Sequence, residues 1–189
     1  MESLEQFMMS YYAAPITNKV PSKNVSLFEV YLVIRSGKFE PQTIALRALE
    51  GKDERRAYKG GNFDYVSPSG IFSYCNDASL VRHSGILCMD LDDLGTGVDE
   101  MKGKLLSDPI FDTLLMFRSP GGEGLKWFTE IDLTRCDHRT WFAAIRNYLM
   151  VTYGLTEKQV DNSCSNPSKA CFLCYDPDVY IKTELIEYF

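Results

Sequence analysis

Two aspartates at the end of an apolar run are the first residues whose type and spacing could do chemistry. Asp90 and Asp92 close the segment Ile86-Leu-Cys-Met-Asp-Leu-Asp92, which has the composition of a buried strand. Residues two apart on a strand point to the same face, so the two carboxylates would lie side by side. Adjacent carboxylates repel each other, and a divalent cation relieves that repulsion. The pattern indicates a metal site; the alternative is a strand end that simply leaves the core for solvent.

A glycine-rich segment, Ser119-Pro-Gly-Gly-Glu-Gly-Leu-Lys126, is the second candidate. Its backbone N–H groups could face an anion in a turn, shaped by Ser119, Gly121, Gly122 and Gly124. The spacing is not that of a Walker P-loop, and the segment joins two predicted strands, so an ordinary hairpin loop is the alternative. Lys126 lies on the second of these strands and should face something negative. The two aspartates and a substrate phosphate are the candidates.

Three further residues could join this chemistry from distant parts of the chain. Asp161 lies in the segment that leads into a last predicted strand, residues 170–175. Lys169 comes immediately before that strand and could reach a phosphate. His83 precedes the strand that carries the aspartates, where it could orient a ligand or stabilise the loop.

The elements that would position these residues follow the order β-α-β-β-α-β. Strands are predicted over residues 86–92, 111–118, 125–131 and 170–175, and helices over 98–107 and from a cap at Asp137 to Gly154. This is the ferredoxin-like or RRM-like arrangement, in which helices cover one face of the sheet and leave the other open. In the usual 4-1-3-2 strand order, the two aspartates, Lys126 and Asp161 would converge. Such a cluster resembles a two-metal site with a phosphate-binding cation.

The first third of the chain differs in character. Ser26 to Glu29 predicts a capping box before a helix that Gly37 ends, and Pro41 can open the next helix. A charged run over residues 52–59 is typical of a solvated helix face, although its basic residues could also follow a nucleic-acid backbone. Short strands are predicted over residues 63–66 and 71–74. We expect an α+β protein with a mainly helical N-terminal lobe, residues 1–80, packed on a core of residues 81–189.

Composition limits the function classes. The 189 residues carry 26 acidic and 20 basic side chains, for a net charge of -6. That balance disfavours tight, sequence-blind binding of duplex DNA, but bound metal ions can reverse the local sign. Cys171 and Cys174 form a C-x-x-C motif without a second ligand pair, so free thiols are expected rather than zinc. The chain has no apolar run of membrane-spanning length and no basic leader, which favours a cytoplasmic location.

Taken together, the D-x-D strand end, the glycine-rich hairpin and Asp161 resemble the three motifs of archaeo-eukaryotic-type primases. Within that superfamily the chain is most similar to the VirE N-terminal, primase-like domain of bacterial mobile elements. The likeness covers roughly residues 25–182 and rests on four stretches, Val25–Glu29, Leu80–Ile86, Phe117–Trp127 and Ala170–Asp178.

The resemblance implies a nucleotidyltransferase that acts in DNA replication on a single-stranded DNA template with NTPs or dNTPs. Two ions of Mg²⁺ or Mn²⁺ would be held by Asp90, Asp92 and Asp161. The glycine-rich turn, Lys126 and Lys169 would bind the triphosphate, with His83 beside them. A helicase module or protein is the implied partner. Two positions depart from the superfamily, which commonly has histidine at the position of Lys126 and arginine at that of Lys169.

Two other readings follow from the same residues. A catalytically degenerate module of the same fold would bind single-stranded nucleic acid or a replication partner, as the acidic net charge and the two departures favour. A different metal-dependent phosphotransfer enzyme or nuclease could also use the scaffold, because a fold does not fix a function.

Overall fold

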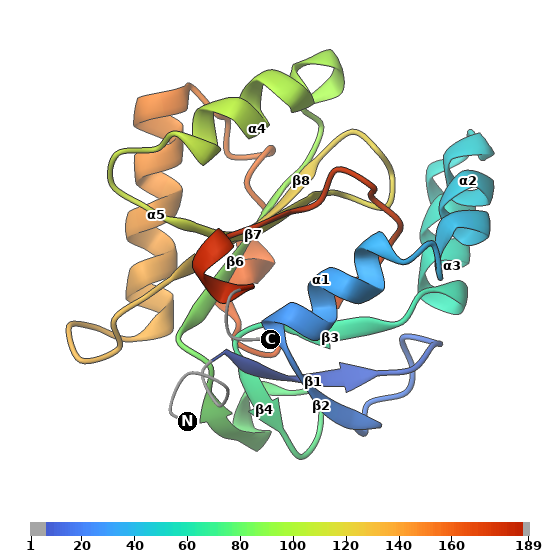
Figure 1. Ribbon diagram of the computed structural model, residues 1–189, viewed down its shortest axis with the longest axis horizontal. Coiled ribbons are helices and arrows are strands. Elements are labelled where there is room, and N and C mark those ends of the chain that lie inside the picture. Colours follow the sequence, from blue (N-terminus) through green and yellow to red (C-terminus); the bar gives the residue numbers. More distant parts are fainter. Residues whose placement is uncertain (1–6, 187–189) are drawn as a thin grey trace.

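Two four-stranded antiparallel sheets organise the computed structural model, which describes residues 7–186 (Figure 1). The first sheet has the order β10 (Tyr180–Ile181), β7 (Thr113–Arg118), β8 (Leu125–Glu130) and β6 (Ile86–Leu91). The second has the order β2 (Lys23–Ser26), β1 (Met8–Tyr12), β3 (Tyr65–Ser67) and β9 (Cys171–Phe172). A separate antiparallel pair joins β4 (Gly70–Phe72) to β5 (Leu80–His83). The predicted α+β class is confirmed.

Five α-helices accompany these strands in the described part of the chain. They are α1 (Leu27–Arg35), α2 (Glu40–Ala48), α3 (Lys52–Asn62), α4 (Val98–Leu106) and α5 (His138–Tyr153). The capping box is present, because the Glu29 N–H donates to Ser26 Oγ and the Ser26 N–H donates to Glu29 Oε2. Asp137 caps α5, and Gly154 ends it in the left-handed conformation that glycine adopts without strain. The sequence therefore determines these helix ends locally.

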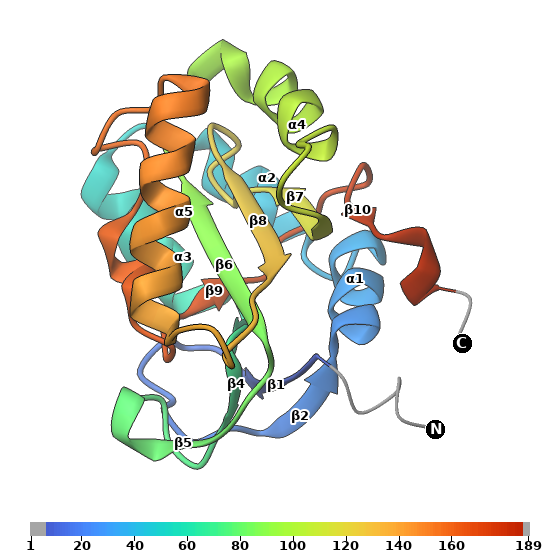
Figure 2. The ribbon, with the colours of Figure 1, turned by 90° about the vertical axis from the view of Figure 1, so that its left-hand side faces the viewer.

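One face of the first sheet packs against α4 and α5, and the residues between them form a buried apolar core. Leu87, Met89 and Trp127 from the sheet pack there with Leu105 of α4 and with α5 residues such as Phe142, Ile145 and Leu149. The indole N–H of Trp127 donates to Thr113 Oγ1 over 2.8 Å, so the buried ring has no unsatisfied polar atom. Figure 2 shows α5 lying along β6 and β8.

The opposite face of this sheet is covered rather than open, which corrects the prediction. Cys88, Phe117 and Phe128 on that face share a second apolar core with N-terminal residues that include Val30, Ile34, Phe39 and Phe63. The reason is that α1 and the second sheet carry apolar faces that need a partner surface. A template therefore cannot lie across the whole sheet.

The last predicted strand, residues 170–175, is wrong in its length and its partner. Only Cys171–Phe172 forms a strand, and it pairs with β3 in the second sheet rather than with β6. The position beside β6 is taken by residues 159–161, through a single bridge between Leu91 and Val160. The backbone hydrogen bonds from Asp92 N to Gln159 O, and from Asp161 N to Asp90 O, measure 2.8 and 3.0 Å.

The N-terminal lobe is less helical than expected, because β1 to β4 all lie within its first eighty residues. Its helix α3 has no buried residue and lies along the edge of the molecule (Figure 1). Four short 3₁₀ helices complete the described elements, at Asp77–Ser79, Gly95–Gly97, Asn162–Ser165 and Thr183–Leu185. Among residues 7–186, no helix combines the length and apolar character needed to cross a membrane.

Candidate metal centre

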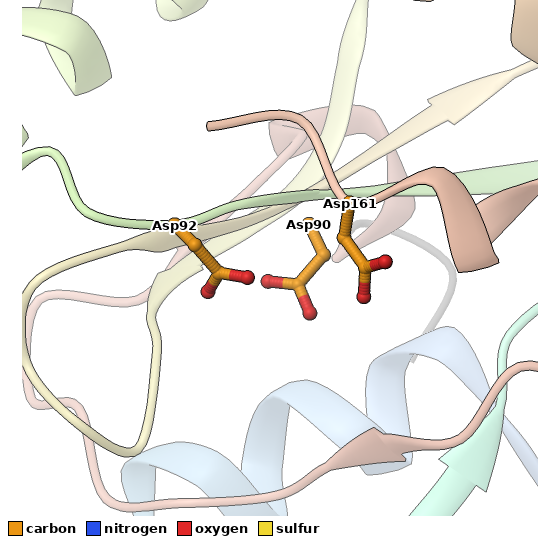
Figure 3. Close-up of side chains that lie close together, drawn as sticks. All are labelled: Asp90, Asp92 and Asp161. Carbon is orange, nitrogen blue, oxygen red and sulfur yellow. The ribbon is translucent and has the colours of Figure 1, made fainter. Parts of the chain in front are cut away.

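Asp90, Asp92 and Asp161 come together as the sequence predicts. One carboxylate oxygen from each lies within 4.8 Å of the others, and Figure 3 shows Asp90 between the other two. Asp90 is on β6, Asp92 follows the strand directly, and Asp161 precedes the 3₁₀ helix at Asn162–Ser165. Within the described residues, this is the one group of three or more carboxylate, thiol or imidazole side chains arranged to hold a metal ion.

Lys126 is the immediate counter-charge of this cluster. It is the register partner of Asp90 on β8, and its ammonium forms an ion pair with Asp90 Oδ2. Both residues are buried, with 7% and 6% of their surface exposed. Burial alone would lower the pKa of Lys126, but the charge and hydrogen bond of Asp90, with the charge of Asp92, outweigh it and raise that pKa. Lys126 is therefore a permanent cation.

The second oxygen of Asp90 lacks a partner. Asp90 Oδ1 is buried and accepts no hydrogen bond from the described residues. Asp90 and Lys126 also line an enclosed cavity of about 10 Å³, which is about the room of one water molecule. A buried carboxylate oxygen without a partner is costly. A hard divalent cation is the ligand that would satisfy it, so the residues fit such an ion.

Asp92 and Asp161 differ in their electrostatics. Burial, followed by the charge of Asp90, raises the pKa of Asp92. For Asp161, burial opposes ionisation, but hydrogen bonds from Lys169 and Ser163 lower the pKa to about 2. The ammonium of Lys169 lies 2.5 Å from Asp161 Oδ2. Of these two carboxylates, Asp92 therefore gains more from a cation, because Asp161 is already paired.

A cleft of about 770 Å³ opens in front of the cluster. Helix α3 forms one wall, and the turn between β7 and β8 forms another. Seven basic side chains line the cleft against three acidic ones, Asp92, Asp93 and Glu123; the basic ones are Lys19, Lys52, Arg55, Arg56, Lys59, Lys126 and Lys169. The cleft is therefore positive although the chain is acidic, and it fits an anionic ligand.

Lys59 of α3 is one of the basic side chains in the cleft lining, and the charge of Lys126 acts on it. Burial, and then the charge of Lys126, lower the pKa of Lys59. Its ammonium lies 5.4 Å from the ring centroid of Phe172, which also lines the cleft. An anion entering the cleft would offset this positive charge, and Phe172 offers an aromatic surface beside it.

The glycine-rich turn is held by arginines that the sequence analysis did not select. Arg47 Nε donates to Pro120 O over 3.2 Å, and Arg55 Nη2 donates to Gly121 O over 2.9 Å. Arg118 Nη1 donates to Gly122 O over 3.1 Å. Arg47 and Arg55 come from α2 and α3, so the N-terminal lobe fixes the turn. Arg55 lies in the charged run over residues 52–59, in which the sequence indicates a solvated helix face whose basic residues could also follow a nucleic-acid backbone, whereas no pattern in the sequence indicated a role for Arg47.

The turn has fewer N–H groups available to an anion than the sequence predicts, because two of them donate within the turn itself. The Ser119 N–H donates to Gly124 O, and the Gly122 N–H donates to Ser119 O. Gly124 is required by close approach, because a side chain there would collide with Leu91 O and lie 3.3 Å from the Cα of Asp92. The turn therefore positions the end of β6 and borders the cleft, with Ser119, Gly121 and Gly124 in its lining.

His83 is not among the residues that line the cleft, and its contacts lie with His138 and Gly85. The Gly85 N–H donates to His83 Nδ1 over 3.0 Å, so the proton of the neutral ring is on Nε2. That nitrogen lies 3.1 Å from His138 Nδ1, and His138 Nε2 lies 3.0 Å from Cys164 O. The two histidines therefore connect β5 to the segment that carries Asp161, and His138 is buried.

The cysteines are free thiols, as expected. Three of them, Cys88, Cys164 and Cys171, line the small cavity beside Asp90. Burial, with the charge of Asp90, raises the pKa of Cys164 to about 12. Burial therefore favours the neutral thiol at Cys164.

Comparison with known proteins yields one match. A family described as BT4734-like, N-terminal domain matches residues 61–181. This region contains the three carboxylates, Lys126, Lys169 and the glycine-rich turn. No curated protein and no solved structure matches the chain.

Proposed function

The chain belongs to the BT4734-like N-terminal domain family, and we propose from the geometry of its site that it is a metal-dependent nucleotidyltransferase of the primase-polymerase type. Its substrates would be nucleoside triphosphates and a single-stranded template. The observation that carries the proposal is the three-carboxylate cluster, whose member Asp92 lines a cleft together with seven basic side chains.

The order of elements supports the primase-like core. β6, α4, β7, β8 and α5 follow one another along the chain, and β8 lies between β6 and β7. Residues 159–161 stand beside β6 where the fourth strand of a ferredoxin-like sheet would lie. Of the four stretches on which the resemblance to the VirE N-terminal, primase-like domain rests, Phe117–Trp127 lies within the β7–β8 part of this core.

The residues divide the chemistry as follows. Asp90 and Asp92, with Asp161 adjacent, would hold Mg²⁺ or Mn²⁺, which supplies activation of a hydroxyl and stabilisation of the leaving pyrophosphate when bound. Lys126 and Lys169 place fixed positive charge beside the cluster, and Lys59 faces it across the cleft. The arginine-held turn keeps the end of β6 in place. These groups would bind and orient the triphosphate.

The test is strand synthesis by the full chain. The purified protein is incubated with a single-stranded DNA template, NTPs or dNTPs, and Mg²⁺ or Mn²⁺, with and without an annealed primer. Products longer than the primer are expected, and Asp90→Asn or Asp92→Asn should abolish them. Asp112→Asn is the matched control, because Asp112 is exposed and pairs with Lys182. Absence of any product under every condition would refute the proposal.

A binding module of the same fold is the second candidate. The ion pair between Asp90 and Lys126 favours it, because one oxygen of the central carboxylate is already occupied. This candidate predicts that the chain binds single-stranded DNA and that Asp90→Asn leaves binding unchanged. The same synthesis assay also detects a nuclease, because a nuclease shortens the labelled strand.

A further inference from the structure

The central carboxylate of the cluster has two unlike oxygens. Asp90 lies between Asp92 and Asp161 (Figure 3). Its Oδ2 is paired with the Lys126 ammonium, whereas its Oδ1 is buried and accepts no hydrogen bond from the described residues. Asp90 as a whole is 6% exposed. One side of this carboxylate is therefore open to a cation, and the other side already has one.

This arrangement differs from what a two-metal site needs. Two catalytic ions lie roughly 3.5–4 Å apart, so a shared central carboxylate gives one oxygen to each ion. Here the position at Oδ2 is filled by the ammonium of Lys126, and only 7% of the surface of this residue is exposed. Separating the Lys126 ammonium from Asp90 would leave a buried charge without its partner, which is strongly unfavourable. A second metal ion would have to displace it.

The remaining donors and charges also suit a single ion. Asp161 Oδ1 accepts hydrogen bonds from the Ser163 N–H and hydroxyl, each over 2.8 Å, and Oδ2 is paired with Lys169. Three carboxylates face two ammonium groups, Lys126 and Lys169, which leaves one excess negative charge. One divalent cation would change the net charge of the cluster from about −1 to about +1, whereas two would raise it to about +3.

We propose that the cluster takes one divalent cation, on Asp90 Oδ1 and Asp92 with Asp161 adjacent, and that the Lys126 ammonium occupies the position of the second. Lys126 also lines the cleft, so this fixed cation can neutralise a phosphate oxygen there. The inference deepens the proposed function, on which it rests for its substrate, and it replaces the two-ion expectation.

The experiment counts Mn²⁺ on the full chain. Electron paramagnetic resonance and calorimetry are recorded with Mn²⁺ alone, and again with a non-hydrolysable nucleoside triphosphate. The wild type is expected to bind one magnetically isolated Mn²⁺ per chain in both conditions. Lys126→Met removes the ammonium at similar length, so the count with nucleotide is expected to rise from one to two. Lys104→Met is the control, because Lys104 is on α4 and pairs with the exposed Glu100.

Two spin-coupled Mn²⁺ ions in the wild type would overturn the inference, and so would no bound Mn²⁺ or a Lys126→Met count that stays at one. If Lys126→Met does not fold, the wild-type spectrum decides alone, because coupled and isolated ions differ in line shape. Strand synthesis by a wild type with two coupled ions would overturn this inference and leave the proposed function intact. One isolated ion without any strand synthesis would refute the proposed function and leave the single-ion inference intact.

Discussion

Asp90 on β6 and Lys126 on β8 are register partners, and their ion pair is buried, with Lys126 in the lining of the basic cleft. A pair in this position has two roles. It holds two neighbouring strands together, and it sets how much negative charge the cluster offers to a cation. The first role can be measured without any substrate.

Removing one member of this pair should be far more destabilising than removing both. We expect Lys126→Met to lower the free energy of unfolding by about 3–5 kcal/mol, because Asp90 is left charged and buried. The double variant Asp90→Asn/Lys126→Met should recover most of the loss, and Mn²⁺ should recover part of it in the single variant. Urea denaturation measures all three proteins. Strictly additive losses would show that the two side chains act independently.

Gly124 should not tolerate a side chain. A methyl group there would collide with Leu91 O and crowd the Cα of Asp92. Gly124→Ala is expected to cost about 1–3 kcal/mol of stability and to weaken Mn²⁺ binding at least about tenfold, measured by denaturation and calorimetry. Gly61→Ala is the matched control, because a methyl group at Gly61 of α3 would contact nothing within 4 Å. Equal effects at the two glycines would contradict the packing argument.

The His83–His138 pair should make stability depend on pH. Burial, then the charge of His138, lowers the pKa of His83 to about 4, and burial lowers that of His138. Since the unfolded chain binds these protons more readily, stability should be complete above pH about 6.5. It should fall as the pH drops from there toward about 4.

Most of the groups around His138 reduce the lowering of its pKa and therefore reduce its share of the pH dependence. The charges of Asp77 and Asp137 and the hydrogen bond to Cys164 O favour its protonation, whereas the charge of Arg139 opposes it. Urea midpoints between pH 4 and 8 give the slope for the wild type and for His83→Gln, which removes one titrating ring. The variant should show a shallower slope in this window, and an identical slope would exclude His83 as the cause.

The exposed basic face of α3 should contact nucleic-acid phosphates. We expect Arg56→Gln/Lys52→Gln to weaken binding of single-stranded DNA and to reduce the slope of log K against log salt by about 0.7 per lost contact. Fluorescence anisotropy over a salt series gives both quantities. Lys104→Gln on α4 is a charge-matched control for one substitution. A slope that does not change in the double variant would place the strand elsewhere.

The sequence was sufficient for elements defined by local chemistry. The capping box at Ser26, the caps of α5 and the run of β6 each depend on neighbours in the chain. The convergence of Asp90 with Lys126 was also predictable, since the usual strand order of a β-α-β-β-α-β sheet places the strand that carries Lys126 beside the strand that carries Asp90. Sequence reasoning therefore located most of the cluster.

What it could not locate were contacts chosen by tertiary packing. β9 has only two residues, and its partner β3 comes from another part of the chain. No local pattern distinguishes that pairing from one with β6. Arg47 likewise is an ordinary helical arginine until α2 is placed against the turn. The covered sheet face was missed for the same reason, because its core depends on residues far apart in the sequence.

The second apolar core has a consequence for how the molecule unfolds. Its members include residues of β1, β2, α1 and α2 as well as residues of β6 to β8 and the later segment with Cys171, Leu173 and Cys174, whereas the family match starts at residue 61. The segment that matches the family, residues 61–181, is therefore shorter than the stretch of chain that contributes side chains to this core. A fragment of residues 61–181 would lose β1 and β2, expose β3 as a free edge and leave the turn without Arg47 and Arg55. We expect the fragment to aggregate and the full chain to melt in one transition.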